Sequence, residues 1–160
     1  MISNINKSIL ELDPEIYICH QCNCESVHAL GLAKAIFDKY PDSDIYSYNY
    51  LVSRIPGTII IRGNVINMLA QITPGKPNDT YDSPKKRIRF FKACLNEISK
   101  YFSKMRQSSY TIAFPWGIGC GLAGASAGNA SADWKIYEKQ IQNFAENNPS
   151  LNIIICEYNK

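Results

Sequence analysis

The sequence predicts an α/β domain with three layers, α/β/α, around a mixed central sheet. Strand-like and helix-like segments alternate along the chain, as they do when helices connect the strands of one sheet. Several strand-like runs are apolar throughout, which indicates that helices cover both faces of the sheet. Two adjacent strand-like runs joined by a short turn add an antiparallel pair. The 160 residues contain no internal repeat and no linker, so we expect one domain over residues 1–160.

Five segments have the composition of strands, and a turn joins two of them. The segments are residues 16–19, 58–62, 65–71, 110–114 and 152–157. Gly63-Asn64 separates the second from the third and has the composition of a hairpin turn. The loop over residues 73–83 is rich in turn-forming residues and should be exposed.

Three segments have helical spacing of apolar residues. The first, 31–40, ends before Pro41, where helices usually stop. The second begins with Ser83 as N-cap and Pro84 at its first position, and its apolar face continues to about residue 103. The third covers 134–146, with Asp133 as its cap. We expect its inward side chains to be Ile136, Ile141 and Phe144.

Composition excludes several classes of protein. The formal net charge of +3, from 17 basic and 14 acidic residues, is too small to indicate binding to nucleic acid or to a membrane surface. No apolar run approaches the roughly 18 residues of a membrane span. The N-terminus lacks the pattern of a signal peptide. We therefore expect a monomeric cytoplasmic protein whose six cysteines are reduced thiols.

The spacing of Cys19, Cys22 and Cys24, with His20 among them, suggests zinc as an alternative. A structural zinc site needs a second pair of ligands at matching spacing, and the other three cysteines are scattered singly. We expect neither a metal nor another cofactor.

Two loops should meet beyond the carboxyl ends of the strands, where open α/β sheets bind ligands. One is residues 21–24 and the other is residues 114–122, in which Gly117, Gly119 and Gly121 alternate. Successive backbone amides in such a turn can hold an anion, usually a phosphate. The spacing matches neither a phosphate-binding loop of the Walker type nor a dinucleotide fingerprint. From these residues alone, an anion site and a tight turn without a ligand are equally good interpretations.

Both loops resemble those of a known family. Cys19-His-Gln-Cys-Asn-Cys24 followed by Gly31-Leu-Ala-Lys-Ala-Ile-Phe37 resembles the first ligand loop of macrodomains. Phe114-Pro-Trp-Gly-Ile-Gly-Cys-Gly-Leu-Ala-Gly124, with Asp133-Trp134 after it, resembles their second loop. The similarity runs from about residue 8 to the C-terminus and is greatest to the branch that processes ADP-ribose 1''-phosphate. It implies a macrodomain-like fold with a mixed central sheet and a cleft for ADP-ribose.

The resemblance also implies a role for each loop. Asn23 would hydrogen-bond the distal ribose as both donor and acceptor, although a turn-capping asparagine is the alternative. The start of the first helix would face the diphosphate or the distal ribose, and the glycine loop would wrap the diphosphate and any 1''-phosphate. Ser8 and Ile9 would contact adenine. The residues implied in the helix and the glycine loop are Gly31, Leu32, Ala33, Gly117, Ile118, Gly119, Cys120, Gly121 and Leu122.

The chain departs from the family pattern at three places. Ser8 stands where many macrodomains have an aspartate that reads the adenine amino group, so adenine selectivity is open. Leu30 stands where close relatives often have a histidine, and His28 lies two residues earlier. Residues 125–132 form an insertion of small and polar residues before Asp133.

Asp133 is the first choice for a base that activates water, and a plain helix cap is the alternative. Cys120 could be a nucleophile or a packing residue, and Lys76 could bind phosphate, attack an ADP-ribosyl ester or lie in solvent. Trp116 and Tyr81 could stack on a base or cover the ribose, and Trp116 could equally be a packing residue at the rim. With Asn23 and Asp133 as catalytic residues, we expect hydrolysis of ADP-ribose 1''-phosphate to ADP-ribose and phosphate.

The alternatives are a non-catalytic reader or sensor of ADP-ribose or a related nucleotide, and a hydrolase that removes ADP-ribose from modified side chains. The partners would be ADP-ribose, its 1''-phosphate or ADP-ribosylated macromolecules, with no membrane involved.

Overall fold

Six strands form one mixed sheet in a computed structural model, which describes residues 2–47, 52–105, 107, 109–120 and 130–158. The strands are ordered β1-β6-β5-β2-β4-β3, and all neighbouring pairs are parallel except β3 with β4. Their bounds are β1 Ile2–Ile5, β2 Tyr17–Cys22, β3 Ile59–Arg62, β4 Val65–Leu69, β5 Tyr110–Pro115 and β6 Leu151–Cys156. The predicted mixed sheet with one antiparallel pair is confirmed, and Gly63 makes the hairpin turn with φ +57°.

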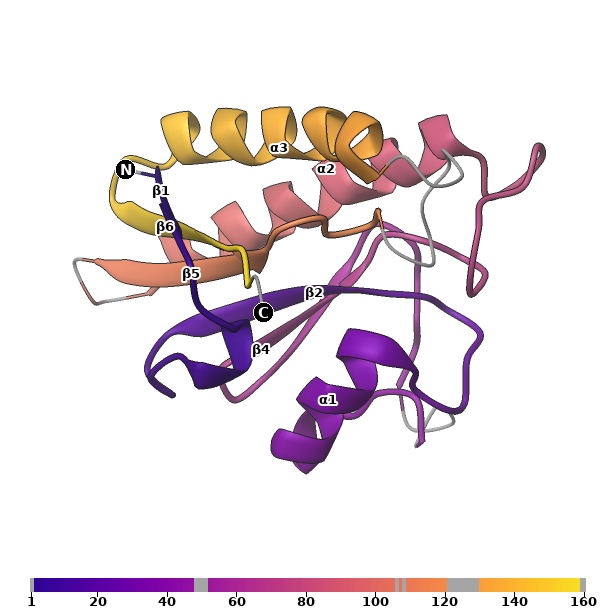
Figure 1. The fold of residues 1–160 in the computed structure, drawn as a ribbon, viewed down its shortest axis with the longest axis horizontal. Coiled ribbons are helices and arrows are strands. Elements are labelled where there is room, and N and C mark those ends of the chain that lie inside the picture. Colours follow the sequence, from indigo (N-terminus) through magenta and orange to yellow (C-terminus); the bar gives the residue numbers. More distant parts are fainter. Residues whose placement is uncertain (1, 48–51, 106, 108, 121–129, 159–160) are drawn as a thin grey trace.

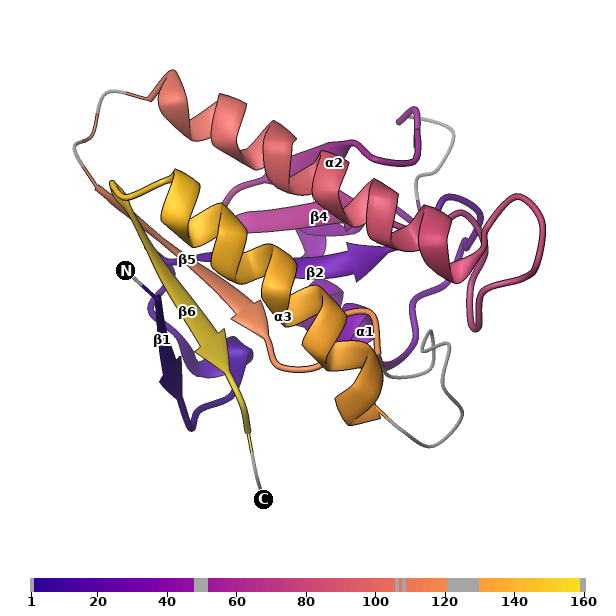
Figure 2. The ribbon, with the colours of Figure 1, turned by 90° about the horizontal axis from the view of Figure 1, so that it is seen from above.

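Helices cover both faces of the sheet, as the apolar strands predict. α2 (Pro84–Ser103) and α3 (Ala130–Asn147) lie side by side on one face, and α1 (Gly31–Lys39) lies on the other (Figures 1 and 2). Two short 3-10 helices, η1 (Ile9–Glu11) and η2 (Pro41–Ser43), flank the α1 face. The architecture is therefore the three-layer α/β/α arrangement.

Alternate residues of the strands supply two separate cores. Ile18 and Cys22 of β2 pack with Ile36 and Phe37 of α1. Cys19, between them in sequence, points to the other face and packs with α2 and α3. Cys19 and Cys22 therefore lie on opposite faces of the sheet, which removes them as a ligand pair for one metal ion. Among the described residues no group of three or more His, Cys, Asp or Glu could hold a metal.

α2 begins as predicted, since Ser83 accepts a hydrogen bond from Lys86 N and Pro84 is the first helical residue. α3 begins earlier than predicted, at Ala130, so that Asp133 lies in its first turn and is not its N-cap. Ile141 and Phe144 are buried as predicted, but Ile136 is not. Ile136 is 50% exposed, while Trp134 and Tyr137 are buried. In the described part of the chain, no helix is long and apolar enough to cross a membrane.

Candidate functional site

A cavity of about 660 Å³ lies at the carboxyl ends of β2, β4 and β5. The first turn of α1 and the segments that follow these three strands supply its walls. It is therefore where ligands bind in open parallel sheets, and its volume suits a nucleotide-sized ligand. We call it the cleft. Its lining consists of His20, Gln21, Asn23, Ser26, His28, Leu30, Gly31, Leu32, Ala33, Tyr46, Gln71, Pro74, Gly75, Lys76, Pro115, Trp116, Gly117, Ile118 and Gly119.

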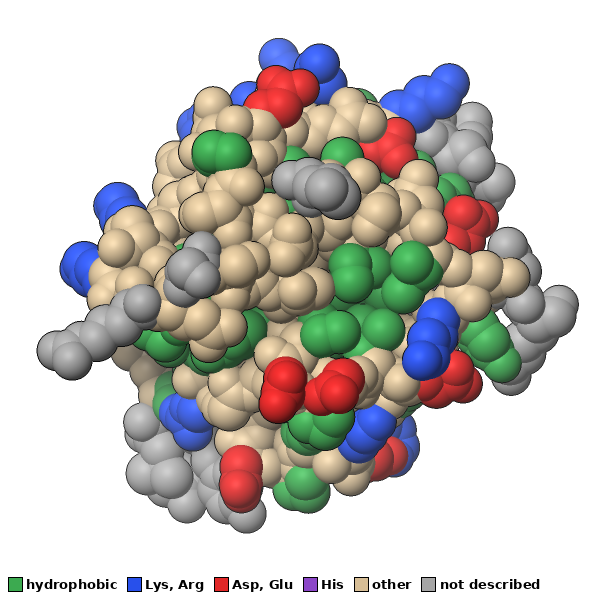
Figure 3. All heavy atoms as spheres, turned by 90° about the vertical axis from the view of Figure 1, so that its left-hand side faces the viewer, with side chains coloured by type: hydrophobic (Ala, Val, Ile, Leu, Met, Phe, Trp, Pro, Cys, Tyr) green, Lys and Arg blue, Asp and Glu red, His purple; other side chains and the backbone are tan. Residues whose placement is uncertain are grey.

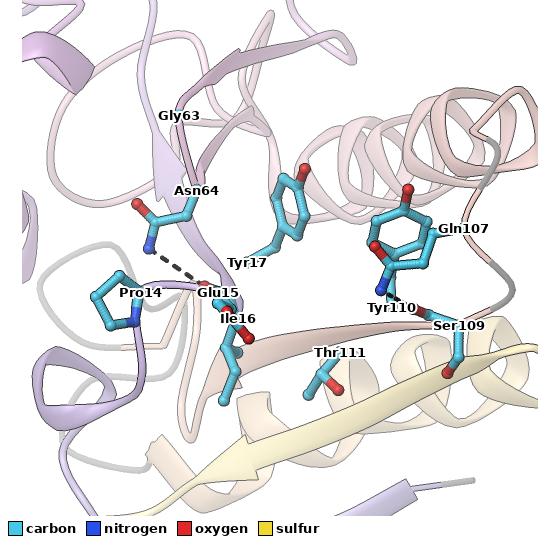
Figure 4. A pocket seen from close by; sticks show the side chains of 10 residues that line it. All are labelled: Pro14, Glu15, Ile16, Tyr17, Gly63, Asn64, Gln107, Ser109, Tyr110 and Thr111. Carbon is cyan, nitrogen blue, oxygen red and sulfur yellow. Dashed lines mark hydrogen bonds between the residues drawn. The ribbon is translucent and has the colours of Figure 1, made fainter.

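A second cavity, of about 550 Å³, lies at the opposite end of the strands, where β2 and β5 begin. Tyr17 and Tyr110 form part of its wall. The side-chain amide of Asn64 donates to Ile16 O, and that of Gln107 donates to Ser109 O (Figure 4). Glu15 is the only charged residue in its described lining. On this side of the molecule, lysine and arginine side chains are spread around the periphery (Figure 3). The described residues that line this cavity include no lysine or arginine, and its Asn64 and Gln107 side-chain amides already donate to backbone carbonyls.

The cleft is electrostatically suited to an anion. Among the described residues that line it, Lys76 is the only lysine or arginine, and no aspartate or glutamate is present. A phosphate group would therefore meet one positive charge and no opposing carboxylate.

The glycine turn after β5 forms one wall of the cleft. Gly117 and Gly119 have φ of +76° and +77°, which side chains other than glycine rarely adopt. The amides of Ile118 and Cys120 close the turn by donating to Pro115 O and Gly117 O. Within the described residues, the amides of Gly117 and Gly119 have no hydrogen-bond acceptor, so they are available to a ligand.

The N-terminus of α1 forms the facing wall. Leu30 is its N-cap residue and provides no side-chain hydrogen bond to the first turn. Gly31, Leu32 and Ala33, at the start of this helix, line the cleft as predicted. An uncapped helix N-terminus presents amide donors and the positive end of the helix dipole. His28 also lines the cleft.

Asn23 lies at the end of β2 and is 7% exposed. Its Oδ1 accepts hydrogen bonds from Glu25 N at 3.0 Å and from Ser26 N at 2.7 Å. Tyr46 Oη accepts from Asn23 N, and Arg54 donates to Asn23 O. The turn-capping interpretation is thus confirmed, and only Nδ2 remains for a ligand, so Asn23 can serve as a donor but not as both donor and acceptor.

Two side-chain amides connect the cleft floor to its wall. Gln21 Nε2 donates to Gln71 Oε1 at 2.7 Å, and Gln71 Nε2 donates to Thr73 O at 2.9 Å. Since a carbonyl can only accept, Thr73 O fixes the orientation of both amides. Nothing in the spacing of the sequence pairs these residues, because the contact depends on the register of β2 against β4.

His20 is 1% exposed and lies beneath the cleft. Its Nε2 is 2.6 Å from Asn67 Oδ1, and Asn67 Nδ2 donates to Ser43 O and Ile60 O. Asn67 Oδ1 is therefore the acceptor, and His20 carries its proton on Nε2. Burial lowers the pKa of His20 to about 4, and the hydrogen bond to Asn67 offsets only part of this effect. His20 is neutral at pH 7.

Asp133 and Cys120 lie behind the glycine turn and do not line the cleft. Asp133, which is 8% exposed, lines a small adjoining pocket with Tyr137 and Gly119, and Gly119 also borders the cleft. Burial, followed by the charge of Asp133, raises the pKa of the Cys120 thiol to about 12. The thiol donates to Ile118 O, and its raised pKa disfavours the thiolate, so the structure favours the packing role of Cys120 over a nucleophile.

The remaining predicted residues are placed as follows. Ser8 accepts a hydrogen bond from Leu10 N and caps η1, and Ile9 is buried in the α1-side core. Neither lines the cleft, so their contact with adenine stays a prediction. Gly121, Leu122 and most of the insertion lie outside the described residues. Trp116 lines the cleft and packs against Trp134, whereas Tyr81 is 52% exposed and does not line it.

No protein-family model matches the chain, and no curated protein does. Solved macrodomain structures do match it. An Oceanobacillus iheyensis macrodomain solved with ADP has 16% identity and a TM-score of 0.65, and the match covers 99% of this chain and 84% of that one. A Trypanosoma brucei macrodomain solved with ADP-ribose has 15% identity and a TM-score of 0.59, with 97% and 63% covered.

The macro domain of ganglioside induced differentiation associated protein 2 has 12% identity and a TM-score of 0.61, and the match covers 99% of this chain and 77% of that one. These matches extend over nearly the whole chain, although few residues are identical. They confirm that the chain has a macrodomain-like α/β fold.

Proposed function

We propose that this protein binds ADP-ribose in the cleft. One observation carries the proposal: two sets of available backbone amides, at the α1 N-terminus and at Gly117 and Gly119, face one cavity whose only charged lining side chain in the described residues is Lys76. Donors in this arrangement suit a diphosphate, because each of its oxygens accepts hydrogen bonds and carries negative charge. The ADP and ADP-ribose complexes of structures with the same fold support this choice of ligand.

Within this proposal, Asn23 Nδ2 donates to a hydroxyl of the distal ribose. Its Oδ1 is already used by the turn, which holds the amide group in one orientation. Such preorganisation reduces the entropy lost on binding. Trp116 offers an aromatic ring at the wall of the cleft for stacking or for apolar contact.

Calorimetry with ADP-ribose tests the proposal, with ADP and ribose 5-phosphate as comparison ligands. We expect micromolar affinity for ADP-ribose, weaker binding of ADP and still weaker binding of ribose 5-phosphate, because each lacks groups that the cleft contacts. Equal affinity for all three would mean that the cleft is a general anion site.

Hydrolysis of ADP-ribose 1''-phosphate is the second candidate function. The observation in its favour is that Asp133 lies buried behind the glycine turn, in a small pocket that shares Gly119 with the cleft. In this proposal Asn23 positions the ribose, and Asp133 orients water and accepts its proton as the water attacks phosphorus. The bond between phosphorus and the 1''-oxygen breaks, that oxygen takes a proton from solvent, and ADP-ribose and phosphate are released.

Release of inorganic phosphate from ADP-ribose 1''-phosphate tests the second function, and ADP-ribosylated peptides provide a parallel assay. Phosphate release supports the phosphatase, and release of ADP-ribose from peptides supports a hydrolase of modified side chains. A protein that binds ADP-ribose and is inert in both assays is a reader.

A further inference from the structure

Asp82 and Arg87 form an ion pair that is almost inaccessible to solvent. Arg87 Nη2 lies 2.7 Å from Asp82 Oδ2, and the two side chains are 2% and 0% exposed. Burying two charges is costly unless their hydrogen bonds are satisfied, and it often adds little to stability compared with apolar residues. Neither residue lines the cleft, so contact with a ligand does not account for the pair.

The hydrogen bonds of the pair converge on one short segment. Asp82 accepts from Ile72 N at 3.1 Å and from Thr73 N and Thr73 Oγ1 at 2.9 and 2.7 Å. Arg87 donates to Gly75 O at 2.8 Å and to Thr73 O at 3.1 Å. Burial alone would raise the pKa of Asp82, but the bonds from Arg87 and Thr73 outweigh it and hold this pKa at about 2.

The other side of the same segment forms a wall of the cleft. Pro74, Gly75 and Lys76 line the cavity, and Thr73 O accepts a second bond from Gln71 on the cleft floor. Gly75 has φ +73°, so the chain turns sharply immediately before Lys76. Gly75 O belongs to the peptide that joins Gly75 to Lys76. The hydrogen bond from Arg87 to this oxygen therefore restrains the backbone at Lys76 and the direction of its side chain.

We propose that the Asp82–Arg87 pair is a positioning device that holds the segment 72–75 so that Lys76 meets the anionic part of the ligand. The inference rests on the proposed function. It extends that function because Asp82 and Arg87, which do not line the cleft, would set the position of the lysine that binds the anion. A lysine at an unrestrained loop would lose more side-chain and backbone freedom on binding. Holding its backbone from the buried side reduces that loss.

A double-mutant cycle on ADP-ribose affinity tests the coupling. Lys76→Met keeps the apolar stem and removes the charge, and we expect about tenfold weaker binding. Arg87→Lys keeps a charge beside Asp82 but cannot reach Thr73 O and Gly75 O together, and we expect a loss of similar size. In the Lys76→Met protein, Arg87→Lys should cause little further loss, because the lysine it positions is gone.

Ser99→Ala is the matched control. It removes the hydrogen bond from Ser99 to Asn148, on the far part of α2, and should lower the melting temperature without changing affinity. If Arg87→Lys does not fold, Thr73→Val replaces it. This change removes the hydroxyl's hydrogen bonds to Asp82 and from Arg87 and leaves the ion pair. The proposal would be overturned if Arg87→Lys, or Thr73→Val in its place, weakened ADP-ribose binding equally in the parent and in the Lys76→Met protein. It would also be overturned if that variant folded and bound ADP-ribose as tightly as the parent.

Failure of the proposed function would give a different result. A parent protein that does not bind ADP-ribose contradicts that function, and the same cycle is then measured with pyrophosphate as the anion. Coupling between Arg87 and Lys76 toward pyrophosphate would sustain the positioning role. Absence of pyrophosphate binding, or of coupling, would overturn it.

Discussion

The backbone of Gly119 lies directly against the ring of Tyr137. A Cβ atom built on Gly119 would be 2.9 Å from Tyr137 Cζ and 2.9 Å from Gln21 Oε1. These distances are shorter than any ordinary contact, and φ at this position is +77°. Glycine is therefore required here by the protein itself, before any ligand is considered.

Gly119→Val should lower the free energy of unfolding by roughly 2–5 kcal/mol, because overpacking and backbone strain combine. The resemblance to macrodomains alone would suggest that the valine fills the phosphate position, but its side chain is directed at Gln21 and Tyr137. Thermal unfolding measures the effect. A melting temperature equal to that of the parent would contradict this description of the turn.

Gly117→Asn tests the role of the glycine turn in binding. A Cβ at Gly117 has no neighbouring atom of the described residues within 4 Å, and asparagine tolerates positive φ better than most residues. We expect a nearly unchanged fold and at least tenfold weaker ADP-ribose binding by calorimetry. Gly63→Asn is the matched control, since Gly63 also has positive φ and open space but lies in the β3–β4 hairpin. If the two variants bind ADP-ribose with equal affinity, the glycine turn does not contact the ligand.

Asn23→Asp and Asn23→Ala should separate the two roles of Asn23. Aspartate keeps an oxygen that accepts from Glu25 N and Ser26 N, but it replaces the Nδ2 donor with a charge that repels phosphate. We expect Asn23→Asp to fold normally and to lose ADP-ribose affinity by more than tenfold. Asn23→Ala should lose affinity and also about 1 kcal/mol of stability, because both turn amides lose their acceptor. Calorimetry and thermal unfolding together distinguish the two variants.

Stability should fall as the pH is lowered from about 6.5 to about 4, because His20 is buried as a neutral ring. Its pKa is about 4 in the folded protein and about 6.5 when unfolded, so the unfolded state binds the proton first. The loss should be about 3 kcal/mol across this range. The carboxylate of Asp82, with a pKa of about 2, is protonated only below this pH range. Glutamine can still donate to Asn67, so His20→Gln should flatten the dependence measured by denaturant unfolding.

Asp133→Asn should lower kcat for phosphate release by about 10²–10⁴ with little change in ADP-ribose affinity, if Asp133 is the base. Asparagine keeps the size and the polarity of the side chain, so packing around α3 is retained. Phosphate release under saturating substrate is the measurement. A parent that turns over and an Asp133→Asn variant with full activity would assign Asp133 to the structure of α3 alone.

Much of the fold follows from local signals in the sequence. Ser83-Pro84 marks the start of α2 correctly, and the apolar runs locate β2 to β6 to within a few residues. β1 was not predicted, because its four residues are largely exposed and form a strand only by pairing with β6. The start of α3 was placed four residues late, because Asp133-Trp134 has the pattern of a cap followed by an apolar residue.

The candidate site was predicted less completely, because its contacts come from elements far apart in the chain. Gln21, Asn23, residues 115–119 and the start of α1 belong to the predicted motifs and line the cleft. The contacts of Gln71 with Gln21 and of Tyr46 with Asn23 depend on strand register and tertiary packing, which no local pattern encodes. The resemblance also gave no indication that Asn23 Oδ1 would be used inside the turn.

The pairing of β1 with β6 bears on the order of folding. It joins Ile2 to Ile153, so it closes a loop of nearly the entire chain, and its entropic cost is the greatest of any strand pair in the sheet. The pairs that carry the cleft, β2 with β4 and β2 with β5, connect residues much closer in sequence. We expect this pairing to form late, because its loop-closure entropy is offset only after the nearer contacts have formed. We therefore expect the half of the molecule that carries the cleft to assemble while the N-terminal strand is still undocked, with the sheet edge at β6 covered last.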